Sequence, residues 1–393
     1  MTDQQTNASG AGKAPPDVRT MMSQLVAIPS ISSASPDWDH SNEAVVRLLA
    51  EWLEPLGFRN EILPVPGMPG KVNLVATLGT GSGGLVLSGH TDTVPYDDKR
   101  WQSDPFTLTE KDNRLYGLGT CDMKGFFALA IEAAREAAQQ PLKQPLIILA
   151  TADEESSMNG ARALAEAGYP KARYAVIGEP TTLKPIRMHK GIMMERLVFE
   201  GQSGHSSDPS LGRNALEGMN EAMNELLALR AQWQEKHRNP HFAVQYPTLN
   251  LGCIHGGDNP NRICARCELH FDLRPLPGMD MAELRQTILT RLQPLASRRE
   301  LSLEFQPLFD GVPPFETSAE AELVKVCEKL TGQQADAVAF ATEAPWLQQL
   351  GLETLVMGPG SIDQAHQPDE YLDLSQIDPT ITLFKQLIRH FCL

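Results

Sequence analysis

The chain has 393 residues, of which 34 are Lys or Arg and 49 are Asp or Glu, so its formal net charge is −15. The length exceeds that of one typical domain, and 41% hydrophobic with 21% charged residues is ordinary for a globular protein with a sizeable core. The acidic balance argues against nucleic acid and anionic membranes as partners, because both attract Lys and Arg. The negative charge is compatible with acidic residues concentrated around a metal ion or a cationic substrate.

The first 19 residues, MTDQQTNASGAGKAPPDVR, contain Ser, Gly, Pro and Gln in place of the basic start and apolar centre of a secretory signal. We therefore expect a flexible tail over residues 1–19 and a cytoplasmic protein. Six cysteines in a chain of this length are too few to indicate a disulfide framework. The lack of such a framework is typical of proteins in a reducing compartment. No run approaches 18 apolar residues, so the sequence predicts no membrane span.

Short apolar runs alternate with segments of helical periodicity in both outer parts of the chain. The runs are residues 85–87, 146–149, 174–177 and 354–357. The helical segments are residues 41–56, 123–138, 319–330 and 379–391. Such runs are typical of strands buried on both faces, as in a parallel sheet covered by helices. The alternation predicts an α/β catalytic domain with a mostly parallel sheet over 20–183 and 312–393.

The middle of the chain follows a different pattern. Residues 264–274 alternate between apolar and polar side chains, as a half-buried antiparallel strand does. The expected elements are a strand at 191–200, a helix at 214–229, strands at 248–254 and 264–274, a helix at 282–295 and a strand at 301–305. This βαββαβ order predicts an inserted ferredoxin-like domain over 184–311.

A His, Asp or Glu follows each apolar run, at the sheet edge where open α/β sheets bind ligands. His90 and Asp92 are two residues apart and point the same way in a strand-like stretch. His90 can then bind a metal through one ring nitrogen while Asp92 orients the ring through the other. The alternative interpretation is a polar strand end with a capped turn.

Glu154 and Glu155 follow the run at 146–149. Adjacent carboxylates repel each other unless a cation lies near them. Successive side chains point to different sides, so one carboxylate can bind metal while its neighbour faces a water molecule. A solvated acidic loop is the alternative, but the apolar run directly upstream places the pair at the mouth of a buried sheet.

Three further residues complete this set: Asp122, Glu179 and His366. With His90 and Glu155 they make two imidazoles and three carboxylates, which is more than a single zinc ion needs. Such a set suits two metal ions a few ångströms apart with one carboxylate bridging them. The residues therefore predict a two-metal site at the carboxyl ends of the parallel strands.

Long segments of the chain resemble the family of co-catalytic zinc deacylases and aminopeptidases that includes aminoacylase. The resemblance runs in order from about residue 20 to the end and covers both predicted domains. The matching segments are GHTDTVP (89–95), WQSDPFTLTEKDNRLYGLGTCDMKG (101–125), ATADEESSM (150–158), IGEPT (177–181), GQSGHSSDP (201–209), PTLNLGCIHGGD (247–258), LRPLPGM (273–279) and GPGSIDQAHQPDEY (358–371).

The resemblance implies a role for each member of the five-residue set. His90 and Glu179 would bind one metal, Asp122 would bridge, and Glu155 and His366 would bind the second metal. The expected cofactors are two divalent ions per chain, Zn²⁺ with Co²⁺ as a substitute.

Five other residues receive roles from the same resemblance. Asp92 would support His90, and Glu154 would be the general acid and base. His205 would reach the site of a neighbouring subunit and help to stabilise the oxyanion, which requires a homodimer built through the inserted domain. Asn261 and Arg274 are expected contacts for a substrate carboxylate. The alternative interpretations are a turn with a helix cap for residues 204–207 and a solvated side chain on a strand face for Arg274.

The implied activity is hydrolysis of an N-acyl amino acid, a small-molecule substrate. The nearest likeness within the family is to members that convert N-acetyl-L-ornithine to L-ornithine and acetate, a step of arginine biosynthesis. Another acyl-amino-acid deacylase or peptidase, such as one acting on N-acetylcitrulline, is the alternative. A second alternative is a non-catalytic, metal-binding relative. The sequence nevertheless retains every metal ligand and the glutamate that the resemblance implies for catalysis.

Overall fold

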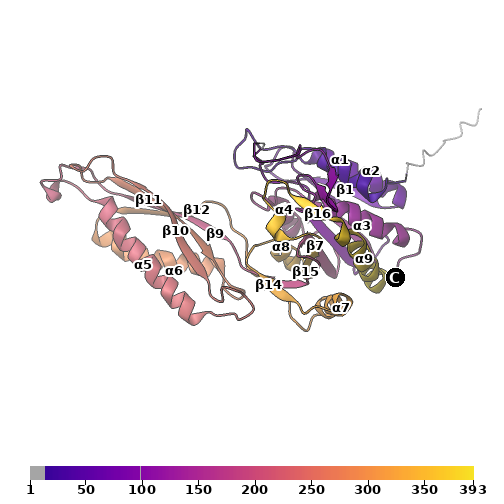
Figure 1. Ribbon diagram of the computed structural model, residues 1–393. Coiled ribbons are helices and arrows are strands. Elements are labelled where there is room, and N and C mark those ends of the chain that lie inside the picture. Colours follow the sequence, from indigo (N-terminus) through magenta and orange to yellow (C-terminus); the bar gives the residue numbers. More distant parts are fainter. Residues whose placement is uncertain (1–13, 98) are drawn as a thin grey trace, which may run out of the picture. The chain divides into compact units, whose positions relative to one another are not determined.

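The computed structural model of the chain describes residues 14–97 and 99–393 (Figure 1). Residues 1–13 of the expected tail lie outside this described part, and helix α1 already begins at Val18. The chain folds into two compact units. The first comprises the chain up to Ile186, Thr317–Ala335 and Trp346–Leu393, and the second comprises Arg187–Glu316 and Asp336–Pro345. The second unit thus also takes in residues 336–345, which the sequence analysis left in the catalytic domain.

The first unit is built on a mixed sheet in which hydrogen-bonded strands follow the order β1-β2-β6-β3-β7-β15. The pairs β6–β3, β3–β7 and β7–β15 are parallel, whereas β1–β2 and β2–β6 are antiparallel. The strand bounds are β1 Arg59–Pro64, β2 Val72–Leu78, β3 Leu85–His90, β6 Leu146–Thr151, β7 Tyr174–Pro180 and β15 Glu353–Gly358. A smaller sheet pairs β4 Thr109–Lys111, β5 Arg114–Tyr116 and β16 Tyr371–Asp373.

The four apolar runs of the sequence are the parallel strands β3, β6, β7 and β15, and every residue of β3, β6 and β7 is buried. Their continuous hydrophobicity follows from this burial, because helices leave no face of the parallel sheet to solvent. The predicted α/β class with a mostly parallel central sheet is confirmed.

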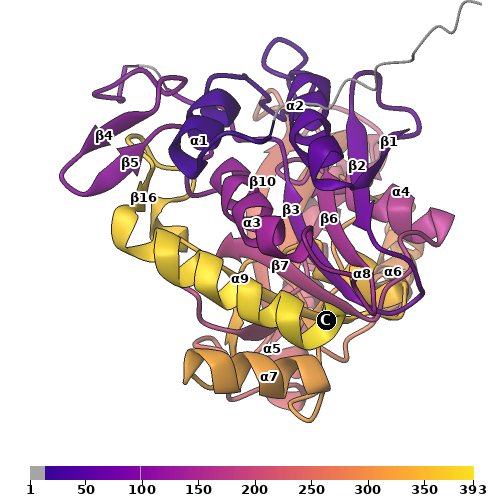
Figure 2. The same cartoon turned by 90° about the vertical axis from the view of Figure 1, so that its right-hand side faces the viewer.

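Helices α3 and α9 lie side by side against β3 (Figure 2), and α1 and α2 also contact α3. Phe126 of α3 and Phe384 of α9 meet edge to face with ring centroids 5.6 Å apart, within one continuous core. The helices of this unit are α1 Val18–Val26, α2 Glu43–Leu53, α3 Lys124–Ala137, α4 Asn159–Ala167, α7 Glu322–Thr331, α8 Ala344–Gln349, which begins in the second unit, and α9 Ile377–Cys392. The 3₁₀ turns are Glu54–Leu56, Ile362–Gln364 and Leu374–Gln376.

The second unit contains a four-stranded antiparallel sheet with strand order β10-β11-β9-β12. Its elements follow one another as β9 Met193–Glu200, α5 Ala215–Lys236, β10 Thr248–Gly256, β11 Arg266–Arg274, α6 Met281–Arg298 and β12 Ser302–Pro307. The expected βαββαβ order is therefore present. Helix α5 runs seven residues beyond the expected end at 229, because Trp233 continues its buried stripe one turn after Leu229.

Short elements flank this sheet in the chain. They are β8 Ile186–His189, the 3₁₀ turn Pro209–Leu211, β13 Phe315–Glu316 and β14 Asp336–Val338. Strand β8 pairs antiparallel with β13 and also pairs with β14.

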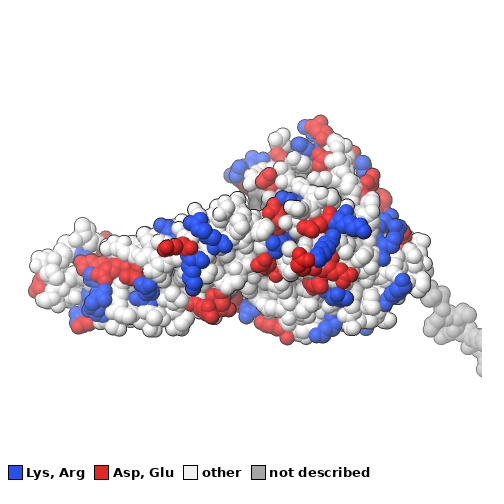
Figure 3. Space-filling model, turned by 90° about the horizontal axis from the view of Figure 1, so that it is seen from below, with Lys and Arg blue, Asp and Glu red and all other residues white. Residues whose placement is uncertain are grey.

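Acidic and basic side chains are interspersed on the face shown in Figure 3, and no extended basic patch is seen there among the described residues. In the described part of the chain, no helix is both long and apolar enough to cross a membrane.

Glu268 supplies a test of how the second unit is held together. It lies on β11 with its side chain 14% exposed, and Arg196 approaches it to 3.0 Å. Hydrogen bonds from Arg196 and His270 lower the pKa of Glu268 to about 2. A carboxyl whose pKa is lowered on folding stabilises the protein above its unfolded pKa of about 4.3, and this stabilisation is lost as the pH falls toward 2.

We expect Glu268→Gln to lower the free energy of unfolding at pH 7 by about 1–2 kcal/mol, a figure reduced for solvent screening. The difference from the unmodified protein should shrink as the pH is lowered toward 2, and chemical denaturation at several pH values measures it. Glu304→Gln is the matched control, because Glu304 pairs with the same Arg196 at 2.8 Å but is 52% exposed. Equal losses in the two variants would contradict the assignment.

Candidate metal centre

Parallel strands bring four of the predicted residues to one edge of the sheet. His90 is the last residue of β3, Glu179 lies near the end of β7, and Glu154 and Glu155 follow β6. The carboxyl ends of parallel strands share one edge, which explains why residues far apart in sequence meet there. His366 reaches the same place from the loop after β15.

Glycines that precede two of these residues are required by the packing beneath the site. A Cβ at Gly89 or at Gly178 would collide with the ring of Phe126. Because neither residue has a side chain, α3 can press Phe126 against the sheet directly below His90 and Glu179. The position of the two polar side chains is thus set by the hydrophobic core.

His90, Asp122 and Glu179 form one buried group of possible metal ligands. The Nε2 atom of His90 lies 3.1 Å from Oδ1 of Asp122 and 3.6 Å from Oε1 of Glu179. The opposite ring nitrogen, Nδ1, lies 3.0 Å from the backbone oxygen of Asp92. This contact leaves Nε2 directed at the two carboxylates.

Asp122, Glu155 and His366 form a second group that adjoins the first. Nε2 of His366 lies 3.0 Å from Oε2 of Glu155 and 3.4 Å from Oδ2 of Asp122. The two carboxylate oxygens of Asp122 therefore face two different imidazoles, with Oδ1 toward His90 and Oδ2 toward His366. A carboxylate in this position can bridge two cations.

The electrostatics of both groups favour positive charge. Burial alone would lower the pKa of His90, but the carboxylates of Asp122 and Glu179 raise it well above its usual value. Contacts with Asp122 and Glu155 raise the pKa of His366 to about 10. For Asp122, burial acts in the opposite direction, yet its contacts with the two imidazoles hold its pKa below the usual range. Burial, followed by the charge of Asp122, raises the pKa of Glu155.

Asp92 is completely buried beside His90, with its Oδ1 atom 3.8 Å from the imidazole Nδ1. This Oδ1 atom has no hydrogen-bond partner among the described residues, whereas Oδ2 accepts a hydrogen bond from the backbone N–H of Glu155 at 3.0 Å. The hydrogen bond to His90 Nδ1 that the sequence analysis expected from the Asp92 carboxylate is thus accepted by its main-chain carbonyl. The carboxylate itself lies against the backbone that carries Glu155.

Asp153 was missed by the sequence analysis and shapes the turn that carries the glutamate pair. It is buried with a left-handed φ of 64°, and its Oδ1 accepts a hydrogen bond from Ser32 Oγ at 2.6 Å. Its backbone oxygen accepts hydrogen bonds from the N–H groups of Ser157 at 3.1 Å and Met158 at 2.7 Å. The only sequence signal for this role was an Asp at a strand end, where Asp tolerates a left-handed turn.

The donor set fits a pair of divalent cations. Four carboxylates and two imidazoles form three overlapping groups, and within each group the ligand atoms lie within 4.8 Å of one another. The third group, besides the two described above, consists of His90, Glu154 and Glu155. The four carboxylates are those of Asp122, Glu154, Glu155 and Glu179. So many acidic oxygens repel one another unless cations lie between them. Imidazole nitrogen and carboxylate oxygen are ligands that Zn²⁺ accepts. The buried Oδ1 of Asp92 beside the ring of His90 has no hydrogen-bond partner among the described residues, and burial raises the pKa of this carboxyl group.

The remaining predicted residues lie in the second unit. The loops of His205 and Asn261 meet, because the N–H of Ser206 donates to the backbone oxygen of Asn261 at 3.0 Å, and both side chains are exposed. Arg274 stands at the far end of β11 from this loop pair, about 26 Å along the strand from Arg266 by the usual rise per residue. Its Nε lies 2.8 Å from Oδ1 of Asp272. The structure thus brings two of these three residues together and separates the third.

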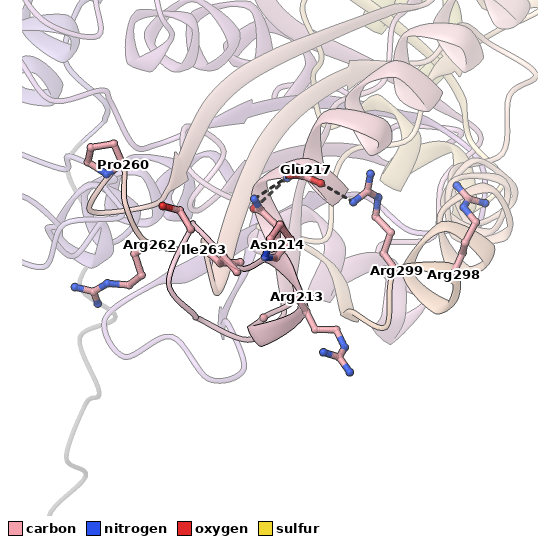
Figure 4. Close-up of a pocket in the computed structure, with 11 residues that line it drawn as sticks. Arg213, Asn214, Glu217, Pro260, Arg262, Ile263, Arg298 and Arg299 are labelled. Atoms are coloured by element: carbon pink, nitrogen blue, oxygen red, sulfur yellow. Dashed lines mark hydrogen bonds and ion pairs between the residues drawn. The ribbon is translucent and has the colours of Figure 1, made fainter.

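The second unit contains a cavity of about 500 Å³. Figure 4 shows four arginines that line it: Arg213, Arg262, Arg298 and Arg299. Each guanidinium already pairs with a carboxylate, for example Arg299 with Glu217 at 3.0 Å. The positive charge of the cavity is therefore compensated within the unit, and the cavity contains none of the possible metal ligands.

The fold and the site together define an α/β protein with paired groups of possible metal ligands at the edge of a parallel sheet, the arrangement of co-catalytic metallohydrolases. The chain belongs to the family described as Peptidase family M20/M25/M40, whose model matches residues 86–390.

Curated relatives are similar to the chain along nearly its whole length. The acetylornithine deacetylase of Proteus mirabilis is 53% identical over 370 residues, which cover 94% of this chain and 95% of the relative. The acetylornithine deacetylase of Pasteurella multocida is 51% identical over 377 residues, with coverage of 96% and 98%.

Solved structures share the fold at much lower identity. A tripeptidase from Staphylococcus aureus superposes with a TM-score of 0.72 at 18% identity, covering 95% of this chain and 97% of that one. An M20 family metallo-carboxypeptidase from Sulfolobus solfataricus gives a TM-score of 0.72 at 16% identity, with coverage of 95% and 99%. A dinuclear metal binding peptidase of the M20 family from Bacillus subtilis gives 0.67 at 15% identity, with coverage of 94% and 96%.

The shared position of Asp122 makes a prediction about metal binding. Asp122→Asn should weaken the binding of both divalent ions, because Asp122 belongs to both ligand groups, whereas Glu179→Gln should weaken only one. The loss should exceed the ~10–100-fold typical of a residue that only supports a ligand. Titration of chelator-treated protein with Zn²⁺ or Co²⁺ measures both affinities, and Asp104→Asn, which changes an exposed carboxylate elsewhere in the same unit, is the control. Loss of a single ion in Asp122→Asn would rule out the bridging geometry.

Proposed function

We propose that the protein hydrolyses the acetyl amide bond of N-acetyl-L-ornithine and releases L-ornithine and acetate. The observation that carries this proposal is the similarity to acetylornithine deacetylases over at least 94% of the chain. The paired ligand groups at the sheet edge supply the chemistry that such a hydrolysis needs. The protein is thus a metal-dependent amidohydrolase, and its product places it in arginine biosynthesis.

The two ligand groups are the proposed metal sites. His90 and Glu179 would hold one ion, Glu155 and His366 the other, and Asp122 would bridge the two. The contacts of the two oxygens of Asp122 with two different imidazoles support this division. Zn²⁺ is the proposed native ion, with Co²⁺ as a substitute.

Two divalent ions held there would polarise the amide carbonyl and lower the pKa of the attacking water. Glu154 is the proposed general base: it accepts a proton from the water as the water oxygen attacks the carbonyl carbon. As the C–N bond breaks, Glu154 passes this proton to the nitrogen of the leaving amine. The burial of Asp92 and its hydrogen bond to the backbone at Glu155 support its proposed role in holding His90 and the glutamate pair in place.

A homodimer built through the second unit is the proposed assembly. Strand β10 stands at an edge of the four-stranded sheet, where its backbone can pair with another chain, and Ile254 on this strand is 46% exposed. The exposed imidazole of His205 would reach the partner's site and donate a hydrogen bond to the oxyanion. Asn261, in the loop beside it, is the proposed contact for the substrate carboxylate, and a contact of Arg274 with the same carboxylate stays a prediction. The cytoplasmic location likewise stays a prediction.

A panel of acyl amino acids tests the substrate. Turnover of N-acetyl-L-ornithine should exceed that of N-acetyl-L-citrulline and of N-succinyl-diaminopimelate. Chelation should abolish activity, and Zn²⁺ or Co²⁺ should restore it. A preference for N-acetyl-L-citrulline would contradict the proposed substrate but would leave the proposed metal-dependent hydrolysis standing. Full activity in thoroughly metal-stripped protein would contradict the proposed mechanism. Binding of metal without hydrolysis of any compound would indicate the non-catalytic alternative.

Neighbouring glutamates should respond differently to the same substitution. Glu154→Gln should keep both metal affinities but lose about 10²–10⁴-fold in kcat, the usual contribution of a general acid or base. Glu155→Gln should weaken one metal site, because an amide oxygen is a poorer ligand than a carboxylate, and excess Zn²⁺ should return part of its activity. Metal titration and steady-state kinetics on both variants make the comparison. Metal loss in Glu154→Gln with metal retention in Glu155→Gln would show that the two roles are reversed.

A further inference from the structure

Glu370 is a buried carboxyl that lies outside the predicted ligand set and is 1% exposed. Its Oε1 accepts hydrogen bonds from the backbone N–H groups of Cys121 at 2.8 Å and Asp122 at 2.9 Å, and its Oε2 accepts one from Gly119 at 3.1 Å. Its own backbone oxygen accepts a fourth hydrogen bond from the N–H of Gly117 at 3.0 Å. One residue therefore accepts hydrogen bonds from four backbone N–H groups in the segment that ends at Asp122.

The same residue is tied to the segment that carries His366. Glu370 follows His366 by four residues and directly precedes Tyr371, the first residue of β16, which pairs with β5. Between them, Asp369 has a left-handed φ of 58° and accepts a hydrogen bond from the N–H of Gln102 at 2.8 Å. The loop from His366 to Glu370 is thus anchored in its last two residues.

A buried carboxyl group is costly unless its oxygens are hydrogen-bonded. Burial, followed by the charge of Asp122, raises the pKa of Glu370 to about 8, and the three backbone N–H groups act in the opposite direction because they favour the ionised form. The side chain of Lys124 is also buried, which lowers its pKa to about 7 although the attraction of Glu370 raises it, and its Nζ donates to the backbone oxygens of Leu25 and Ile28 at 2.9 Å each. The oxygens of Glu370 are therefore satisfied by donors that belong to the segment it holds.

We propose that Glu370 is a positioning residue that sets the distance between Asp122 and His366, and through it the geometry of the metal site that they share with Glu155. It acts through the backbone of residues 119–122 and contacts neither metal nor substrate. This inference rests on the proposed two-metal function. The burial and the three acceptor contacts of one side chain distinguish it from an ordinary loop residue.

The substitution Glu370→Gln keeps the size of the side chain and replaces one acceptor oxygen by an NH₂ group. That group faces an N–H donor, so at least one of the three hydrogen bonds is lost and the segment at Asp122 shifts. We expect the affinity for one divalent ion to fall by about 10–100-fold, as for other residues that orient metal ligands. We also expect kcat to fall with little change in KM, because the substrate contacts are retained.

The experiment compares Glu370→Gln, Glu370→Asp and the unmodified protein by competition titration of Co²⁺ and Zn²⁺ against a chromophoric chelator. Thermal unfolding confirms that each variant is folded at the titration temperature. Glu370→Asp keeps both acceptor oxygens of the carboxyl group but is shorter by one methylene, so its loss of affinity should be intermediate. The control is Asp373→Asn on strand β16, which directly follows Glu370; the Asp373 carboxylate accepts from the N–H of Ser375 at 2.9 Å and does not contact residues 119–122. It should lower thermal stability without changing metal affinity.

Metal affinities of Glu370→Gln that match those of the control would overturn the inference, even if both variants are less stable. If Glu370→Gln does not fold, unchanged affinities in Glu370→Asp would overturn it equally. Failure of the proposed function is a separate result: the unmodified protein would then bind two ions and hydrolyse no acyl amino acid, and the affinity comparison would still decide the role of Glu370. An unmodified protein that binds no divalent ion would overturn both.

Discussion

The repulsion among carboxylates at one buried sheet edge is the constraint on which the site depends. Asp122, Glu154, Glu155 and Glu179 gather there with two imidazoles from the described part of the chain, and one of these, His90, is 1% exposed. Removal from water strengthens the interaction between charges, so the arrangement is stable only with positive charge between the acidic groups. The raised pKa values of both imidazoles follow from the same field. A site with this excess of negative charge attracts cations first and organises a substrate around them.

The fold supplies the rigidity that such repulsion demands. Parallel strands buried on both faces cannot shift without breaking the core, and Phe126 packs below His90 and Glu179 because Gly89 and Gly178 have no side chains. The residues that reach the site from loops are less constrained by the sheet. Their loops therefore need other anchors, which the structure supplies as hydrogen bonds between buried carboxyl groups and the backbone.

The sequence predicted the parallel strands because burial on both faces leaves a continuous apolar run, and it predicted the order of the second unit because alternation marks a half-buried strand. Strand β1 was not predicted, since its partly exposed residues become a strand only by pairing with β2. The sequence also did not show that the carbonyl of Asp92, not its carboxylate, lies nearest His90, because one residue offers both acceptors. Glu370 carried no periodic signal at all, as a lone acidic residue in a loop resembles a solvated one.

Around the candidate metal centre, two buried carboxyl groups each accept a hydrogen bond from the backbone N–H of a possible metal ligand. Asp92 is outside the ligand groups and accepts from the backbone N–H of Glu155, and Glu370 is outside them and accepts from the N–H of Asp122. Burial raises the pKa of both carboxyl groups, that of Glu370 to about 8, and the backbone donors act against this shift. A carboxyl group has two oxygens and can accept several N–H groups at once, which fixes the peptide planes on either side of a ligand. An amide side chain has an NH₂ group in place of the second oxygen and would meet one of these donors with another donor. The number of backbone donors to be held beside a ligand is therefore why the supporting residues of this site are acidic like the ligands they support.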